Sequence, residues 1–160
     1  MQELAPGWVV FAHSNGIAGR LIRFGERLRW KRGSTWNHAA VISRITDGVP
    51  YVIQADIKGV NEAPLSTVGS YIVMAPPQGC DATAVVQFCS SQVGKSKYGL
   101  LSILSIAIDI ITPNWFPELR RDNTWICSAL VGEALRFGGW LHPWGSVYTV
   151  TPAALFDSLH

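Results

Sequence analysis

The first half of the chain contains short segments of two kinds. In some, apolar and polar residues alternate, and in others nearly every residue is apolar. Both patterns predict β-strands. The pair Asp47-Gly48 is a two-residue turn signal that joins two of these runs into a hairpin. Prolines after the last run end the sheet. The expected strands are residues 8–13, 38–45, 51–56, 59–61 and 71–75.

Helical spacing replaces this pattern in the second half. The most apolar segment, residues 99–112, is shorter than the roughly 20 residues that a bilayer span requires, and Asp109 interrupts it, so we expect a buried or groove-lining helix. An earlier helix is expected after Ser14 or Asn15, with a basic flank that we interpret as solvated. The other expected helices are residues 82–93, a segment beginning at Cys127, and residues 151–159 with Pro152 at the first position.

Composition limits the class of protein. The 160 residues suffice for a real core, and we expect residues 1–160 to form a single domain. With 48% hydrophobic and 15% charged residues, the chain is expected to fold with a rather apolar surface, and a net charge of +2 is too small to indicate nucleic acid. The 3 cysteines fit neither a disulfide framework nor a zinc pattern, so we expect reduced thiols, no metal and no other cofactor.

Cys127 lies where an amphipathic helix is expected to begin. The apolar face of this helix comprises Cys127, Leu130, Val131, Ala134 and Leu135. Asn123 or Thr124 is expected to cap its start, and Gly138-Gly139 to close its end. A thiol at a helix start is close to unpaired backbone N–H groups and to the positive end of the helix dipole, which favour the thiolate. Cys127 is therefore a candidate nucleophile.

The other cysteines are interpreted as packing residues, because free cysteine is usually buried. Cys89 shares a helical stripe with Val85 and Phe88, and Cys80 follows a proline-containing loop. A catalytic role for Cys127 requires a base that takes the thiol proton. His38 lies at the start of an apolar strand, where a polar residue usually has a partner or a function.

Four segments in this order resemble the circularly permuted NlpC-type papain-like cysteine hydrolases, the YiiX-like group, in which a strand-borne histidine precedes the cysteine. The segments are residues 36–42 around His38, 51–55 around Gln54, 97–99 around Tyr98 and 126–131 around Cys127. The pattern extends to residues 6–10 and 150–155. The resemblance implies an α+β, papain-like fold with a small antiparallel sheet or barrel packed against helices, and the catalytic cysteine at a helix N-terminus.

The resemblance also implies the role of each site residue. Cys127 attacks a carbonyl carbon as thiolate, and His38 takes the thiol proton and later protonates the leaving group. Gln54 orients His38 at a position where relatives often carry glutamate, although glutamine cannot stabilise an imidazolium by charge. Tyr98 and Asn37 are expected to line the substrate or oxyanion site, where the Cys127 backbone N–H is a further donor.

The register of the hairpin leaves the orienting residue open. A strict two-residue turn at Asp47-Gly48 would place His38 opposite the neighbourhood of Ile57 and bring Asp56 closer than Gln54. A bulge or a wider loop would change this register. We therefore expect Gln54 from the resemblance and keep Asp56 as the reserve.

Three functions remain. We favour a cysteine peptidase or amidase acting on a peptide, a peptidoglycan-type stem peptide or an isopeptide. The alternative is a lipid acyltransferase, thioesterase or phospholipase-type enzyme of the lecithin:retinol acyltransferase-like branch, with an acyl-lipid substrate. The third is a silent structural or binding module, which a Cys127 side chain facing away from His38 would favour.

The sequence also bears on the binding partners and the cellular location of the protein. We expect no nucleic-acid partner, while peripheral membrane contact through residues 99–112 stays open. The N-terminus shows no secretory signal, so we expect a cytoplasmic protein by default. A cell-wall substrate would then require release by lysis or delivery as part of a phage particle.

Overall fold

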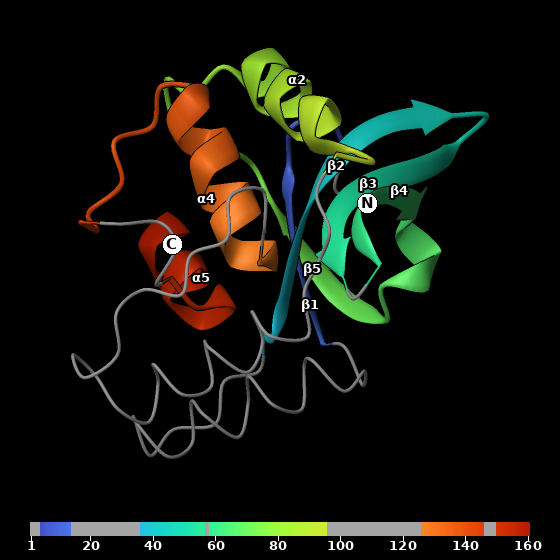
Figure 1. The fold of residues 1–160 in the computed structure, drawn as a ribbon, viewed down its shortest axis with the longest axis horizontal. Helices are drawn as coiled ribbons and strands as arrows, with labels where there is room; N and C mark the ends of the chain where they lie inside the picture. Colours follow the sequence, from blue (N-terminus) through green and yellow to red (C-terminus); the bar gives the residue numbers. More distant parts are fainter. Residues whose placement is uncertain (1–3, 14–35, 57, 96–125, 146–149) are drawn as a thin grey trace.

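The computed structural model describes residues 4–13, 36–56, 58–95, 126–145 and 150–160. Within these ranges the chain forms a five-stranded antiparallel sheet, in the order β4-β3-β2-β1-β5, with helices packed on it (Figure 1). The strands are β1 (Val9–His13), β2 (His38–Thr46), β3 (Val49–Asp56), β4 (Gly59–Pro64) and β5 (Ser70–Met74). The helices are η1 (Leu65–Thr67, a 3-10 turn), α2 (Ala82–Gln92), α4 (Cys127–Phe137) and α5 (Pro152–Leu159). The expected α+β class and antiparallel sheet are confirmed.

The hairpin of β2 and β3 follows the turn predicted from sequence. Asp47 and Gly48 have φ angles of 52° and 75°, and a tight turn of this kind needs positive φ at both central residues. The ladder consequently starts next to the turn, at the pair Thr46 and Val49. β3 therefore begins earlier than the expected residue 51, and β4 continues past residue 61 to Pro64 because it pairs with β3 along its whole length.

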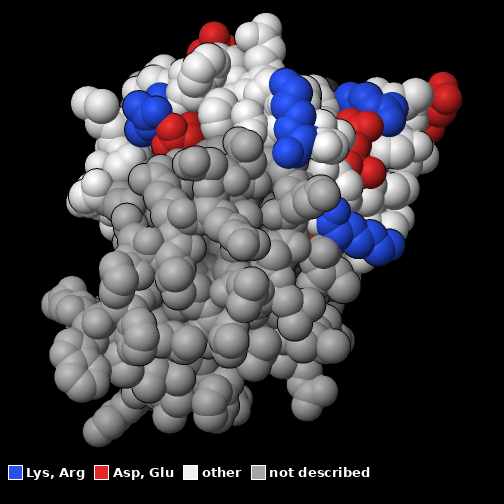
Figure 2. Space-filling model, viewed as in Figure 1, with Lys and Arg blue, Asp and Glu red and all other residues white. Residues whose placement is uncertain are grey.

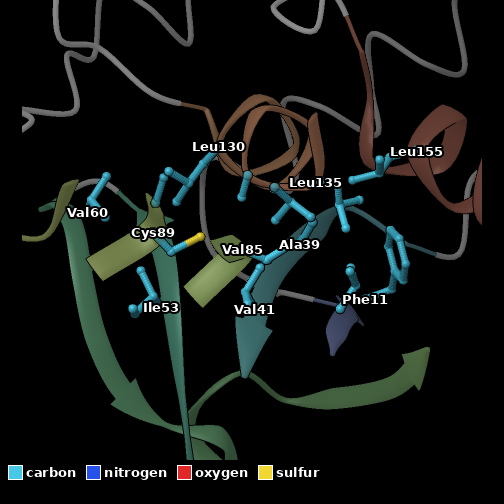
Figure 3. Packing of buried hydrophobic residues seen from close by; sticks show 14 of the residues in the cluster. Phe11, Ala39, Val41, Ile53, Val60, Val85, Cys89, Leu130, Leu135 and Leu155 are labelled. Atoms are coloured by element: carbon cyan, nitrogen blue, oxygen red, sulfur yellow. The ribbon is translucent and has the colours of Figure 1, made fainter. Parts of the chain in front are cut away.

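Apolar side chains fill both faces of the sheet. On one face, alternate residues of β1, β2 and β3 pack against α2, α4 and α5 (Figure 3). The other face has a smaller cluster in which Leu65 and Val68 cover the remaining apolar residues of the strands. The residues labelled in the first cluster are Phe11, Ala39, Val41, Ile53, Val60, Val85, Cys89, Leu130, Leu135 and Leu155. Because residues 9–12 of β1 and 39–42 of β2 are buried on both faces of the sheet, these two stretches are apolar instead of alternating.

The ends of α4 were only partly predicted. Its N-cap is Ile126, which makes no capping hydrogen bond through its side chain, so the expectation that Asn123 or Thr124 caps the helix is wrong. The C-cap is Gly138, as predicted. A Cβ atom at Gly138 would lie 2.7 Å from Cys80 Sγ, so glycine allows the close approach of the loop before α2.

Charged side chains in the described part of the surface are mixed in sign. On the face shown in Figure 2, Lys and Arg side chains lie beside Asp or Glu side chains in several places. Arg44 pairs with Glu62 at 3.0 Å, and Arg136 pairs with Glu133. Exposed pairs of this kind each stabilise a fold by at most about 1 kcal/mol.

Several expectations concern residues outside the described ranges. They are the helix after Ser14 with its basic flank, the apolar segment 99–112 and the site residue Tyr98. Of the helices that the structure does describe, none has the length and apolar character needed to cross a membrane.

Candidate active site

His38 and Cys127 are each the first residue of an element, and both elements begin at the same end of the sheet (Figure 1). His38 opens β2 and lies opposite Ala12 of β1. The backbone N–H of Asn37 donates to the Ala12 carbonyl at 3.2 Å, which fixes the chain just before the histidine. Cys127 opens α4, whose apolar face packs on the central strands. The topology therefore brings together a strand start and a helix start that are distant in sequence.

A β-bulge determines which side chain of β3 meets His38. From the turn to the pair Arg44 and Tyr51 the ladder follows the two-residue hairpin, but the register shifts between Ile42 and Arg44. Beyond the shift, Gln54 lies opposite Ala40. Residues that lie opposite each other in a ladder point to the same face, and so do residues two apart. Gln54 therefore shares a face with His38.

Gln54 holds the imidazole of His38. Its Oε1 atom lies 2.7 Å from His38 Nε2. A carboxamide oxygen can only accept a hydrogen bond, so Nε2 carries the proton in this contact. Nδ1 is then the ring nitrogen left to exchange a proton with a thiol. This arrangement gives the histidine a fixed orientation and tautomer, as a catalytic base requires.

Cys127 is buried, with 3% of its surface exposed, yet polar groups surround its sulfur. Its sulfur interacts with the His38 side chain and accepts hydrogen bonds from the backbone N–H groups of Ala39 and Ser128. Burial alone would raise the pKa of the thiol, but the hydrogen bond and charge of His38 and the two N–H groups outweigh it, so the pKa of Cys127 is lowered.

The pKa of His38 moves in the opposite direction. Burial alone would lower it, since burial disfavours the charged imidazolium. The hydrogen bond and negative charge of Cys127, the hydrogen bond of Gln54 and the charge of Asp56 outweigh burial, so the pKa of His38 is raised. A lowered thiol pKa beside a raised imidazole pKa favours a thiolate and imidazolium pair.

The other two cysteines have no such environment. Cys89 is fully buried among apolar side chains, and burial raises the pKa of its thiol to about 12. Cys80 is partly buried, with Sγ 3.6 Å from the Leu135 carbonyl oxygen. Burial and the negative charge of Asp81 raise the pKa of its thiol.

The remaining predicted site residues lie nearby or outside the described ranges. Asn37 is buried directly before His38, with 1% of its surface exposed. Asp56 ends β3, and its Oδ1 accepts the Lys58 backbone N–H at 2.7 Å. Gln54, and not Asp56, makes the hydrogen bond to His38 Nε2. Tyr98 is outside the described residues.

Two serines support the site and were not predicted from sequence. Ser128 follows the cysteine, and its buried hydroxyl donates to the Val150 carbonyl at 2.5 Å, which ties the start of α4 to the segment before α5. Ser43 lies in the bulge, where its hydroxyl contacts Glu62 Oε1 at 2.6 Å and the Tyr51 carbonyl at 3.2 Å. A small polar residue within an otherwise apolar run was the available signal in both cases.

Comparisons with known proteins support the fold. No protein-family model matches the sequence, and no curated protein matches it. Among solved structures, the chain is similar to the crystal structure of metalloprotein yiiX from Escherichia coli O157:H7, DUF1105. The TM-score is 0.62 at 18% sequence identity, and the alignment covers 96% of this chain and 92% of the other. The chain thus has a YiiX-like α+β fold.

Proposed function

We propose that this protein is a cysteine-dependent hydrolase with a permuted papain-like fold, which cleaves an amide or peptide bond through a thioester intermediate. The observation that carries the proposal is the chain of contacts from Cys127 to His38 to Gln54, in which the thiol is at a helix start and the histidine is oriented by a 2.7 Å hydrogen bond. A nucleophile, a base and an orienting group in this sequence of contacts are the usual arrangement for nucleophilic catalysis.

The proposed reaction proceeds in two stages. In the first, Cys127 Sγ attacks the carbonyl carbon and forms an S–C bond, and His38 protonates the leaving amine as the C–N bond breaks. In the second, His38 takes a proton from water, the hydroxide attacks the thioester carbon, and the C–S bond breaks to release the acid. The Cys127 backbone N–H at the start of α4 is the expected donor to the oxyanion in both stages.

The proposal also bears on the alternatives raised by the sequence. A silent module was expected to have Cys127 facing away from His38, whereas the two side chains are in contact. A lipid acyltransferase or thioesterase would use the same pair, because a thiolate attacks esters and thioesters as well as amides. Acyl lipids therefore belong among the substrates to be tested, with amides as the favoured class.

A metal does not fit this donor set. The similar Escherichia coli protein is described as a metalloprotein, and a catalytic zinc usually has three protein ligands among His, Cys, Asp and Glu. Here Cys127 and His38 are accompanied by an amide, and within the described residues no group of three such side chains is arranged to hold a metal ion. The proposed steps consequently use only the side chains of the chain itself.

The test is to trap the acyl-enzyme. Purified protein would be incubated with peptide amides, peptidoglycan stem peptides and acyl-lipid esters, and the intact mass and the labelled peptide would be measured. We expect an acyl adduct on Cys127 and product release with an amide substrate, both absent in Cys127→Ala and retained in the matched variant Cys89→Ala. Equal product release by wild type and Cys127→Ala would overturn the proposal, and acylation by lipid esters alone would move it to the lipid class.

A further inference from the structure

The hydrogen bond from Gln54 supplies orientation without charge. A carboxamide fixes the position of the His38 ring but is neutral, so the Cys127 thiolate is the main anion that favours the imidazolium. A further carboxylate near His38 would strengthen this effect.

Asp56 is in position to supply that charge. It lies two residues after Gln54 on β3, so both side chains are on the same face of the sheet. Gln54 lies opposite Ala40, and continuing this register by two residues places Asp56 across from His38. The residue is half-buried, and its Oδ1 accepts the Lys58 backbone N–H at 2.7 Å, which holds the carboxylate at the end of the strand.

The groups around His38 can be named element by element. From α4 comes the Cys127 thiol, and from β3 come Gln54 and Asp56. On its other side, β1 presents Ala12 opposite His38 and ends at His13. Lys58 follows Asp56 in the turn to β4 and is exposed. Two negative charges therefore lie near His38, the Cys127 thiolate of α4 and the Asp56 carboxylate of β3. The charge of Asp56 is among the causes that raise the pKa of His38.

We propose that the role of the third catalytic group is divided between two residues, with Gln54 orienting the imidazole and Asp56 acting as a positioning residue whose charge favours the imidazolium. This inference rests on the proposed function, since it concerns the same Cys127 and His38 pair. In a site with a single orienting residue, one substitution removes both orientation and charge. Here, removal of Gln54 would leave the charge of Asp56 in place, and removal of Asp56 would leave the orientation of the ring in place.

The test uses Asp56→Asn, which removes the charge but keeps an oxygen that can accept the Lys58 N–H. The rate of iodoacetamide labelling of Cys127 would be measured against pH by mass spectrometry, and the His38 ring would be titrated by NMR. We expect the labelling midpoint to move to higher pH and the His38 titration to move to lower pH, since an opposite charge near the imidazole favours its protonated form.

Two further variants separate the charge effect from other effects. Asp47→Asn removes the same charge at the exposed hairpin turn, where asparagine tolerates positive φ, and should leave both titrations unchanged. The double variant Gln54→Glu with Asp56→Asn returns a carboxylate to the site and should restore the wild-type midpoint. The inference is overturned if Asp56→Asn titrates like wild type, or if Asp47→Asn shifts the midpoint equally.

The wild-type profile distinguishes the two proposals. Labelling of wild-type Cys127 only at alkaline pH, at the rate of Cys80, would overturn the proposed function together with the role of Asp56. Fast labelling of wild-type Cys127 near neutral pH, unchanged in Asp56→Asn, would overturn only the role of Asp56.

Discussion

Cys127 and Cys89 are both buried cysteines on helices that pack against the same face of the same sheet. Their thiols nevertheless differ in the direction of their pKa shifts. Burial raises the pKa of Cys89 to about 12, whereas the pKa of Cys127 is lowered although burial acts on it in the same direction. The comparison shows that burial alone does not fix the direction in which a thiol pKa moves. The polar groups that replace water around the sulfur decide this direction.

Position within the helix supplies part of the difference. Cys127 is the first residue of α4, where backbone N–H groups have no partner inside the helix, and its sulfur accepts the Ser128 N–H. Cys89 lies in the interior of α2, where the N–H groups are used by the helix itself. The strand beneath supplies the rest, because His38 and the Ala39 N–H reach Cys127 from the start of β2.

The largest predicted effect is the loss of turnover in Cys127→Ala. Removing the nucleophile should lower kcat by at least about a thousandfold, as it does when a covalent catalyst loses its attacking group. The substrate identified by acyl-enzyme trapping would be used, and circular dichroism would verify that the fold is retained. Residual turnover within tenfold of wild type would contradict the proposal that Cys127 is the nucleophile, and would leave it a packing residue like Cys89.

The next effect concerns the pH dependence of the thiol. His38→Ala removes the hydrogen bond and the charge that lower the pKa of Cys127, while burial continues to raise it, so the thiol pKa should rise. The thiolate fraction at pH 6.5 would fall as the thiol pKa rises, so we expect iodoacetamide labelling of Cys127 at pH 6.5 to slow by at least about tenfold.

The slow labelling of Cys89 provides the internal control for that measurement. Its sulfur has no contact with His38 among the described residues, so its labelling should be the same in wild type and His38→Ala. An unchanged Cys127 profile in His38→Ala would show that the helix start alone activates the thiol.

A smaller effect is expected for the orienting residue. Gln54→Ala removes the 2.7 Å contact to His38 Nε2, and the ring gains freedom to rotate. Turnover should fall by about tenfold to a hundredfold, within the range of a general base that has lost its alignment. Asn61→Ala is the matched control, because Asn61 lies opposite Gln54 on β4 and carries the same amide group. Equal losses in the two variants would indicate a general effect on the sheet.

The sequence indicated the positions of Cys127 and His38 more directly than their partnership. Apolar periodicity placed Cys127 at a helix start and His38 at a strand start, which are local properties, and the resemblance supplied the pairing of the two. The order of the strands was not predicted, because it depends on contacts distant in sequence, and the resemblance implied only a small antiparallel sheet packed against helices. The helix cap was predicted wrongly because α4 begins at Cys127, so its N-cap is Ile126 and not a polar residue two or three positions earlier.

The choice between Gln54 and Asp56 was left open for a physical reason. A one-residue change in register moves a side chain to the other face of a sheet. Counting from Asp47-Gly48 places Gln54 opposite Val41, on the face away from His38, whereas the bulge at Ser43 places it opposite Ala40. A single serine that contacts Glu62 and the Tyr51 carbonyl marks this bulge, and such a contact is not visible in an alternating pattern.

The smallest predicted effect completes the comparison of the two cysteines. Cys89→Ala removes one buried sulfur from the cluster formed by α2 and the sheet, so it should lower the free energy of unfolding by about 1 kcal/mol through lost packing. Denaturant titration would measure this loss. The labelling of Cys127 and turnover should stay unchanged, because no polar group of the site depends on Cys89. A change in the Cys127 pH profile would instead show that α2 helps to place α4, and that the two sulfur environments are coupled through the core.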